Sequence, residues 1–153
     1  MQPHDDIRIG TLAPATNGPG YLKQIIPHGF ESFSLTFWQQ IPDGFDMAKF
    51  ADEVKAELEA VETDWKPVIS SLGVFGNPLE DEKTAAGWEQ AIDACELFGC
   101  DIVAGFAGCL DGKPVPEAMP RFKEVFGPLA KRAADKGVRL AFENCDMGGN
   151  WNA

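Results

Sequence analysis

The regular recurrence of short apolar segments is the feature that most constrains the fold of this chain. Segments typical of β-strands begin near Ile7, Ser32, Val68, Asp101 and Val138, at intervals of 25 to 37 residues. The stretches between them carry helical periodicity, with apolar residues three and four positions apart. An alternation of strands and helices is typical of a parallel sheet with right-handed crossover connections. The sequence therefore predicts an α/β protein with five strands and four helices.

The bounds of these elements follow from local signals. Alternation is clearest in the second strand, where Phe33, Leu35 and Phe37 share one face. Pro14 is expected to end the first strand, and Gly137 the last helix. The predicted strands are Ile7–Leu12, Glu31–Trp38, Val68–Phe75, Asp101–Phe106 and Val138–Asp146. The predicted helices are Tyr21–Ile26, Met47–Asp64, Asp81–Phe98 and a last one from Glu117 or Pro120 to Lys136.

The opposite strand faces favour a closed barrel over an open, doubly wound sheet. The residues on these faces are small or polar. They are Ser34 and Thr36 in the second strand, Ser70 or Ser71 with Gly73 in the third, and Arg139 with Glu143 in the fifth. A barrel interior accepts such residues near its mouth, whereas a sheet covered by helices on both sides requires two apolar faces. The predicted fold is therefore a (β/α)8 TIM barrel, of which this chain supplies about the first five strands and four helices.

The length sets the expected domain organisation. Eight units with this spacing would need about 260 residues, close to the roughly 250 of a closed barrel. We therefore expect residues 1–153 to be a single domain, the N-terminal part of a barrel that is incomplete at its C-terminus.

Composition excludes several classes of partner. The net charge is −11, from 24 acidic and 13 basic residues, which argues against nucleic acid or an anionic membrane as a partner. No apolar run approaches the roughly 20 residues that span a bilayer, and the N-terminus lacks the pattern of a signal peptide. The four cysteines form no Cys-x-x-Cys pair. We expect a cytoplasmic protein with reduced thiols and a small-molecule ligand or a metal.

Common nucleotide and nucleophile motifs are absent. The sequence contains no glycine-rich dinucleotide or phosphate loop and no G-x-S-x-G elbow. His4 lies in the N-terminal tail, and His28 precedes a strand, so neither is placed to serve a site at the carboxyl ends of the strands.

Glu143 is the acid that stands at such a carboxyl end. It follows the apolar run of the fifth strand and faces the predicted barrel interior. Burying an unpaired carboxylate costs several kcal/mol, so a metal ion, an arginine or a lysine would have to compensate its charge. A solvated or salt-bridged acid at a strand end is the alternative.

The segment Leu140–Asn144, LAFEN, preceded by AADKGV, resembles the fifth strand of the sugar phosphate isomerase/epimerase group of xylose isomerase-like TIM barrels. That group includes ketose 3-epimerases and inosose dehydratase. The resemblance extends over essentially the whole chain, including IRIGTLAP at the first strand and CDIVAGFAG at the fourth.

The resemblance implies a divalent metal ion, Mn²⁺, Mg²⁺, Co²⁺ or Zn²⁺, with Glu143 as one ligand and the other ligands after Ala153. It also implies that Glu143 transfers a proton during isomerisation or epimerisation of a sugar, sugar phosphate or polyol through an enediolate. The residues expected to line the sugar pocket are Trp38, Asn77, Phe106, Asn144 and Trp151. A homo-oligomer is left open.

One segment departs from the epimerase pattern. Epimerases of this group tend to carry a second glutamate shortly after the Glu-Asn pair, whereas this chain continues CDMGGNW. A metal-dependent dehydratase resembling inosose dehydratase and a non-catalytic fragment are therefore the alternatives to an isomerase or epimerase.

Overall fold

A computed structural model describes residues 7–62 and 65–144 of the chain. Within them, five strands form one parallel sheet in the order β1-β2-β3-β4-β5. The strands are β1 Gly10–Pro14, β2 Ser32–Trp38, β3 Val68–Phe75, β4 Ile102–Gly105 and β5 Arg139–Phe142. The helices are α1 Gly20–Ile25, α2 Met47–Glu59, α3 Glu82–Ala94 and α4 Val115–Asp135, with 3₁₀ turns η1 Ala15–Asn17, η2 Ile26–His28 and η3 Cys95–Phe98.

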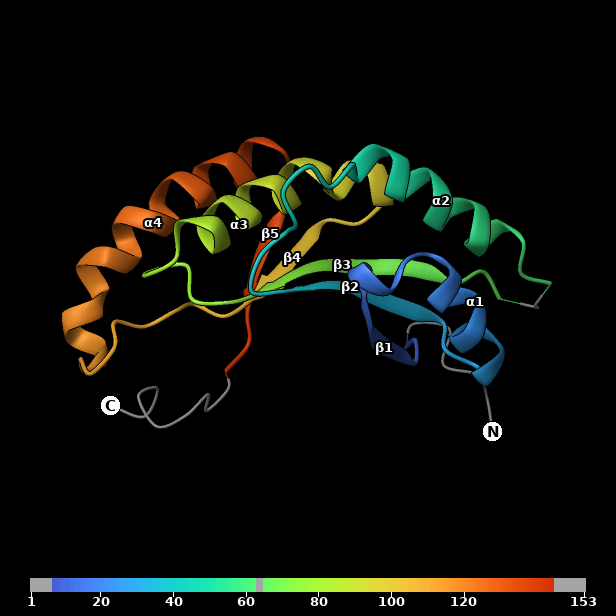
Figure 1. The fold of residues 1–153 in the computed structure, drawn as a ribbon, viewed down its shortest axis with the longest axis horizontal. Coiled ribbons are helices and arrows are strands. Elements are labelled where there is room, and N and C mark those ends of the chain that lie inside the picture. The colour runs from blue at the N-terminus through green and yellow to red at the C-terminus, as the bar shows by residue number, and fades with distance from the viewer. Residues whose placement is uncertain (1–6, 63–64, 145–153) are drawn as a thin grey trace.

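The strand order identifies the architecture. Each strand pairs with the next one along the chain, whereas a doubly wound sheet reverses its order at a switch point. Figure 1 shows α2, α3 and α4 arching over the same face of the curved sheet. The described residues therefore supply five strands and four helices of a (β/α)8 barrel, as predicted.

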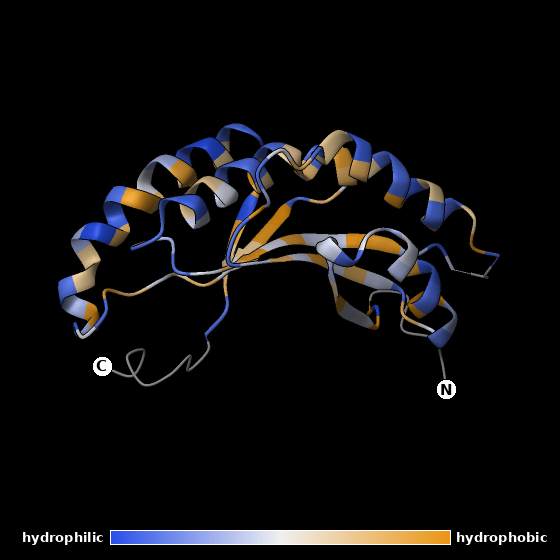
Figure 2. Ribbon diagram, viewed as in Figure 1, coloured by the Kyte–Doolittle hydropathy of each residue, from blue (hydrophilic) through white to orange (hydrophobic). Residues whose placement is uncertain are grey.

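The hydrophobic core lies between the sheet and these helices. Phe33, Leu35 and Phe37 of β2 are buried there, as their alternation predicts. Trp88 of α3 is fully buried, and a Cβ atom built on Gly105 of β4 would lie 2.7 Å from Cζ2 of its ring. Glycine at this position therefore lets the indole approach the sheet. Figure 2 shows apolar residues along the strands and hydrophilic residues on the outward surface of the helices.

The other face of the sheet carries the predicted small and polar residues. Ser71 of β3 pairs with Ser34 of β2, and their Oγ atoms lie 2.7 Å apart. The pairing shifts by one residue after Phe33, so that Ser70 has no partner in the register. This bulge settles which serine faces the interior: it is Ser71.

The first and last strands differ from their predicted bounds. The first strand was predicted over Ile7–Leu12, with Pro14 beyond its end. In the structure β1 spans Gly10–Pro14, and Pro14 pairs with Thr36 in the register. Proline has no backbone N–H and is tolerated in an edge strand, and β1 lies at the edge of the described sheet. The fifth strand was predicted over Val138–Asp146, but β5 spans Arg139–Phe142, and its Ala141 and Phe142 are exposed. The reason is that β5 lies at the edge of the described sheet.

Helix α4 begins before the predicted start. It starts at Val115 and continues through Pro120 and Pro128. Each proline removes a backbone donor from the helix interior, at a cost of about 3 kcal/mol. Packing of the face that carries Phe126 and Leu129 against the core offsets this cost.

Candidate active site

Four side chains occupy the last inward-facing positions at the carboxyl ends of β2 to β5. Trp38 pairs with Phe75 in the β2–β3 register. Phe106 and Glu143 follow the paired residues Gly105 and Phe142, and Glu143 N donates to Gly105 O over 2.9 Å. We call Trp38, Phe75, Phe106 and Glu143 the mouth layer. It places one carboxylate in a row with three aromatic rings.

Phe75 and Phe106 form the buried part of the mouth layer. They are 7% and 6% exposed, and their ring centroids lie 5.2 Å apart at an interplanar angle of 76°. A Cβ atom on Gly73 would lie 2.5 Å from Cε2 of Phe75, so the Phe75 ring covers Gly73 on the inner face. Phe75 was not among the predicted site residues, although its spacing of two and four residues from Gly73 and Ser71 places it on their face.

Trp38 is the exposed aromatic residue of the layer, with 64% of its surface accessible. The backbone after it is fixed by its neighbours. Gln39, at φ 65°, donates from its backbone N to Phe75 O over 2.9 Å. Thr84 Oγ1 of α3 lies 2.6 Å from Gln39 O. The end of β2 that presents Trp38 is therefore anchored to β3 and α3.

Glu143 is exposed, together with Asn144. The expectation that Glu143 is a buried charge in need of compensation is therefore wrong for this structure, because the inner face beside β5 is open among the described residues. Within the same residues Glu143 has no salt-bridge partner. Its carboxylate oxygens thus remain accessible to a ligand, a metal ion or a substrate.

Asn77 links two loops at the mouth. Its Oδ1 accepts from Cys109 N over 3.0 Å, and its Nδ2 donates to Cys109 O over 3.0 Å and to Glu80 Oε2 over 2.9 Å. Glu80 Oε1 in turn accepts from Asp111 N over 2.6 Å. The side-chain amide of Asn77 therefore ties the β3–α3 loop to the β4–α4 loop. A direct contact between Asn77 and a substrate stays a prediction.

Trp151 was expected to line the pocket, whereas His28 was expected to lie away from it. Trp151 and the segment after Asn144 fall outside the described residues. His28, at the end of η2, precedes β2 and so lies at the amino end of the sheet, as expected. Among the described residues, no group of three or more His, Cys, Asp or Glu side chains is placed to hold a metal ion. The mouth layer thus fits a hard divalent ion only as the source of one carboxylate ligand.

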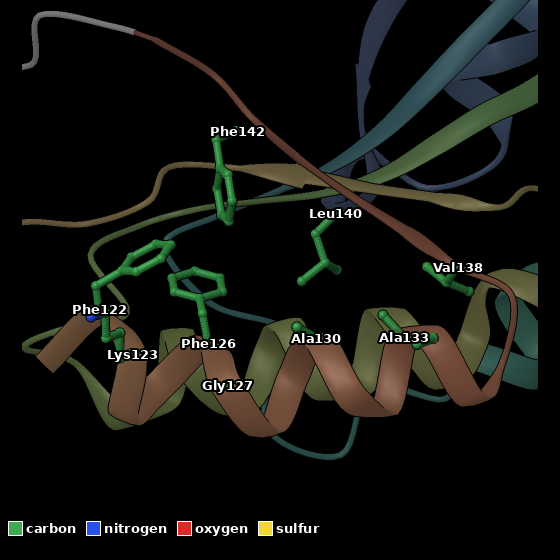
Figure 3. A pocket seen from close by; sticks show the side chains of 10 residues that line it. Phe122, Lys123, Phe126, Gly127, Ala130, Ala133, Val138, Leu140 and Phe142 are labelled. Atoms are coloured by element: carbon green, nitrogen blue, oxygen red, sulfur yellow. The ribbon is translucent and has the colours of Figure 1, made fainter. Parts of the chain in front are cut away.

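Two apolar cavities lie beside the mouth layer rather than within it. A groove of about 520 Å³ runs between α4 and β5, and Figure 3 shows Phe122, Phe126, Leu140 and Phe142 lining it. A smaller cavity of about 240 Å³ lies between the β4–α4 loop and α4 and includes Cys109. Both linings are mostly apolar and lack paired acids or bases, so neither competes with the mouth layer as a site for proton transfer.

The lengths and compositions of the helices were compared with those of membrane-spanning helices. No helix within the described residues combines the length and the apolarity that crossing a membrane requires.

Comparison with protein families gives one match. The sequence model described as a xylose isomerase-like TIM barrel matches residues 22–152. No curated protein sequence matches this chain.

Solved structures share the fold at low sequence identity. The structure of L-ribulose 3-epimerase has a TM-score of 0.62 at 18% identity, covering 91% of this chain and 50% of that one. A xylose isomerase-like TIM barrel protein from Mycobacterium smegmatis, in complex with magnesium, has a TM-score of 0.63 at 20% identity, covering 95% and 57%. A probable 3-DHS dehydratase from Bacillus anthracis has a TM-score of 0.56 at 14% identity, covering 90% and 52%. This chain therefore spans between half and three-fifths of the length of these proteins.

Proposed function

The chain belongs to the xylose isomerase-like TIM barrel family, and from this premise we propose that it is part of a divalent-metal-dependent isomerase or epimerase. The proposed substrate is a sugar, a sugar phosphate or a related polyol. The observation that carries the proposal is the mouth layer, in which the accessible carboxylate of Glu143 stands in a row with the aromatic rings of Trp38, Phe75 and Phe106. The whole enzyme's activity, cytoplasmic location and lack of a nucleic-acid partner belong to the same proposal.

The chemistry of the layer suits a sugar. The C–H faces of a sugar ring are apolar and pack against aromatic rings, so exposed Trp38 is proposed to stack on the substrate. Phe75 and Phe106 are packed against each other, and we propose that they exclude water from the space beneath the substrate. Exposed Asn144 is proposed to hydrogen-bond a hydroxyl group. Trp151, outside the described residues, is proposed as a further wall of the pocket.

Glu143 is proposed to transfer the proton. A carboxylate beside the carbon next to a carbonyl group removes its proton, which produces an enediolate, and returns the proton to the same or the neighbouring carbon. A bound divalent ion would polarise the carbonyl oxygen and so stabilise the negative charge of the enediolate. Glu143 would provide one oxygen ligand to that ion, and the remaining ligands would come from outside the described residues. The magnesium ion of the Mycobacterium smegmatis structure supports this part of the proposal.

A dehydratase is the second candidate. It would use the same carboxylate to remove the proton and would then expel a neighbouring hydroxyl group as water. The structural similarity to the probable 3-DHS dehydratase and the sequence CDMGGNW after Asn144 favour retaining it. The products distinguish an epimerase from a dehydratase. In D₂O an epimerase forms an isomer of the substrate that carries deuterium, whereas a dehydratase forms a product that has lost one water molecule.

The test is substitution of Glu143 in the complete protein. Glu143→Gln keeps the size of the side chain but removes its charge and its basicity. We expect metal affinity to fall and turnover on ketoses to drop by about 10²- to 10⁴-fold, the usual contribution of a general acid or base. Metal content is measured by elemental analysis, and turnover by deuterium exchange.

Glu59→Gln, at the exposed last residue of α2, is the matched control and should retain wild-type turnover. Purification without any divalent ion, combined with unchanged turnover in Glu143→Gln, would contradict the proposal and leave the non-catalytic alternative.

A further inference from the structure

We propose that Cys95 and Cys100 form a redox-active thiol pair, which a neutral hydroperoxide converts to an intramolecular disulfide through initial attack at Cys100. The pair lies where η3 leads into β4, at the amino end of the sheet. The mouth layer lies at the opposite end of the strands. The proposed chemistry is therefore separate from that of Glu143.

The end of η3 brings the two cysteines together. Gly99 is left-handed, with φ 66°, and its backbone N donates to Glu96 O over 3.1 Å. Cys100 N donates to Cys95 O over 3.2 Å. These two bonds define a Schellman motif, which is frequently accompanied by a side-chain contact between the positions that Cys95 and Cys100 occupy. Here the two thiols are hydrogen-bonded to each other. The turn geometry thus places one thiol against the other.

The spacing is suitable for a disulfide. Residues joined by a direct backbone hydrogen bond have Cα atoms roughly 5 to 7 Å apart, which overlaps the range of about 4.4–6.8 Å observed in disulfides. Cys100 Sγ lies 3.7 Å from Cys95 O, so its side chain already points back over the turn. Closing the bond needs side-chain rotation but no rearrangement of the helix or the strand.

The two thiols differ in access and acidity. Cys95 is fully buried, whereas Cys100 is half-buried and lines a surface groove of about 510 Å³. The hydrogen bond from the Cys95 thiol lowers the pKa of Cys100, and the backbone N–H of Ile102 adds to this effect against burial. The same pairing raises the pKa of Cys95. An accessible thiolate beside a second thiol is the arrangement typical of peroxide-sensitive cysteines.

The reaction balances with one equivalent of hydroperoxide. The Cys100 thiolate attacks the peroxide O–O bond and becomes a sulfenic acid. The second oxygen leaves as hydroxide or, for an organic hydroperoxide, as alkoxide, and takes up a proton to form water or an alcohol. The Cys95 sulfur then attacks the Cys100 sulfur, which expels the sulfenic oxygen as a second water. The two thiols lose two electrons and the peroxide gains them.

The charge of the groove selects the oxidant. Its lining includes the acids Asp93, Glu96, Asp101 and Asp135 and the single cation Lys136. Arg132 and Lys136 pair with Asp93, and Arg139 pairs with Asp101. Among the described residues Glu96 and Asp135 have no salt-bridge partner, so the groove keeps a negative charge around them. An anionic disulfide such as oxidised glutathione is repelled at this opening, whereas a neutral hydroperoxide is not.

The experiment treats the whole protein with hydrogen peroxide under native conditions, blocks the remaining thiols and digests after glutamate. Cleavage at Glu96, between the two cysteines, should yield two peptides joined by a disulfide and separated by reduction. Oxidised glutathione at the same concentration should form this bond at least tenfold more slowly. Equal rates with both reagents would overturn the assignment to a neutral oxidant.

Variants identify the order of the steps. Cys95→Ser should stop at a Cys100 sulfenic acid that dimedone labels, and Cys100→Ser should give neither product. Cys109→Ser is the matched control and should form the disulfide as wild type does. Because Cys95 is buried, circular dichroism verifies that its variant is folded. In the wild type, a disulfide of Cys100 with another cysteine, or protection of Cys100 from peroxide, would overturn the proposal.

Discussion

Gly73 shows how a single residue shapes the mouth layer. It occupies the inward face of β3 between Ser71 and Phe75, and the ring of Phe75 lies over its Cα atom. Any side chain at this position would compete with the ring for the same space. The absence of a Cβ atom thus leaves room for the Phe75 ring, which packs against Phe106.

Gly73→Ala is expected to destabilise the protein. The added Cβ would lie 2.5 Å from Phe75 and 3.2 Å from Cγ2 of Thr36, so the ring must move. Overpacking of this kind costs about 1–3 kcal/mol, which thermal unfolding monitored by circular dichroism would detect as a lower midpoint. Gly127→Ala in α4 is the control, because nothing lies within 4 Å of its added Cβ and alanine favours a helix. An unchanged midpoint for Gly73→Ala would show that the Phe75 ring does not need this space.

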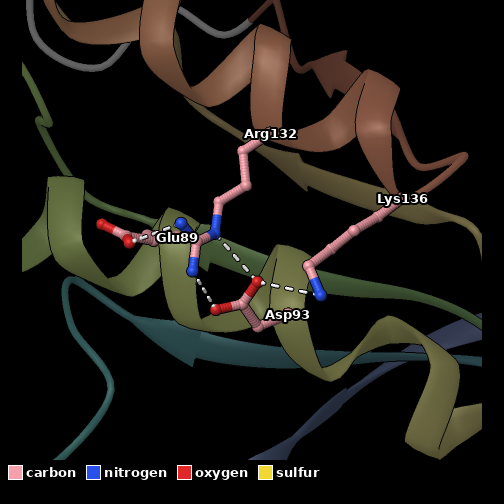
Figure 4. A network of polar contacts seen from close by, with 4 residues as sticks. All are labelled: Glu89, Asp93, Arg132 and Lys136. Carbon is pink, nitrogen blue, oxygen red and sulfur yellow. Dashed lines mark hydrogen bonds and ion pairs between the residues drawn. The ribbon is translucent and has the colours of Figure 1, made fainter.

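Among the elements, α3 and α4 are joined by a charged network on the outer surface. Figure 4 shows Arg132 of α4 between Glu89 and Asp93 of α3, with Lys136 on the other side of Asp93. Arg132 Nε and Nη2 donate to the two oxygens of Asp93 over 2.8 Å and 2.5 Å. This two-point contact fixes the register of the helices above the strands that carry Phe75 and Phe106.

The Asp93 network makes stability depend on pH. Its hydrogen bond with Arg132 lowers the pKa of Asp93, with a smaller contribution from Lys136. A carboxyl group whose pKa is lower in the folded state contributes stability above its unfolded pKa of about 4 and loses it as pH falls through the folded value. We therefore expect the midpoint of thermal unfolding to drop below about pH 4.

Asp93→Asn should remove part of this pH dependence and cost about 0.2–1 kcal/mol at neutral pH, the usual range for an exposed ion pair. Asp52→Asn, on the exposed surface of α2, provides the control. Identical pH profiles for Asp93→Asn and wild type would contradict the assignment.

At the scale of the whole molecule, the described sheet leaves apolar surface open at both edges. Leu12 of β1 is 57% exposed on the inner face, and Phe142 of β5 is 44% exposed beside the groove along α4. Strand edges and apolar patches of this kind promote association with other chains.

Residues 1–153 expressed alone are therefore expected to self-associate. Sedimentation velocity should show a weight-average mass that rises with protein concentration. Leu12→Lys, which places a charge on the inner face without disturbing the buried core, should reduce this association. A single monomeric species at every concentration would contradict the expectation.

The sequence by itself determined the elements and their faces. Alternation separated Phe33, Leu35 and Phe37 from the polar side of β2, and the bounds predicted for β3 agree with the structure. The same periodicity placed Glu143 on the inner face at a carboxyl end. These features were predictable because side-chain direction in a strand depends on position along that strand alone.

The tertiary structure decided everything that depends on partners distant in the chain. Phe75 joins the site because it meets Phe106, Asn77 ties two loops because its amide reaches Cys109, and Glu143 is exposed because β5 lies at the edge of the described sheet. No local pattern encodes these contacts, since they form between segments about 30 residues apart or more. Burial and hydrogen-bond partners are properties of the packed sheet, whereas the facing of each residue is a property of its strand.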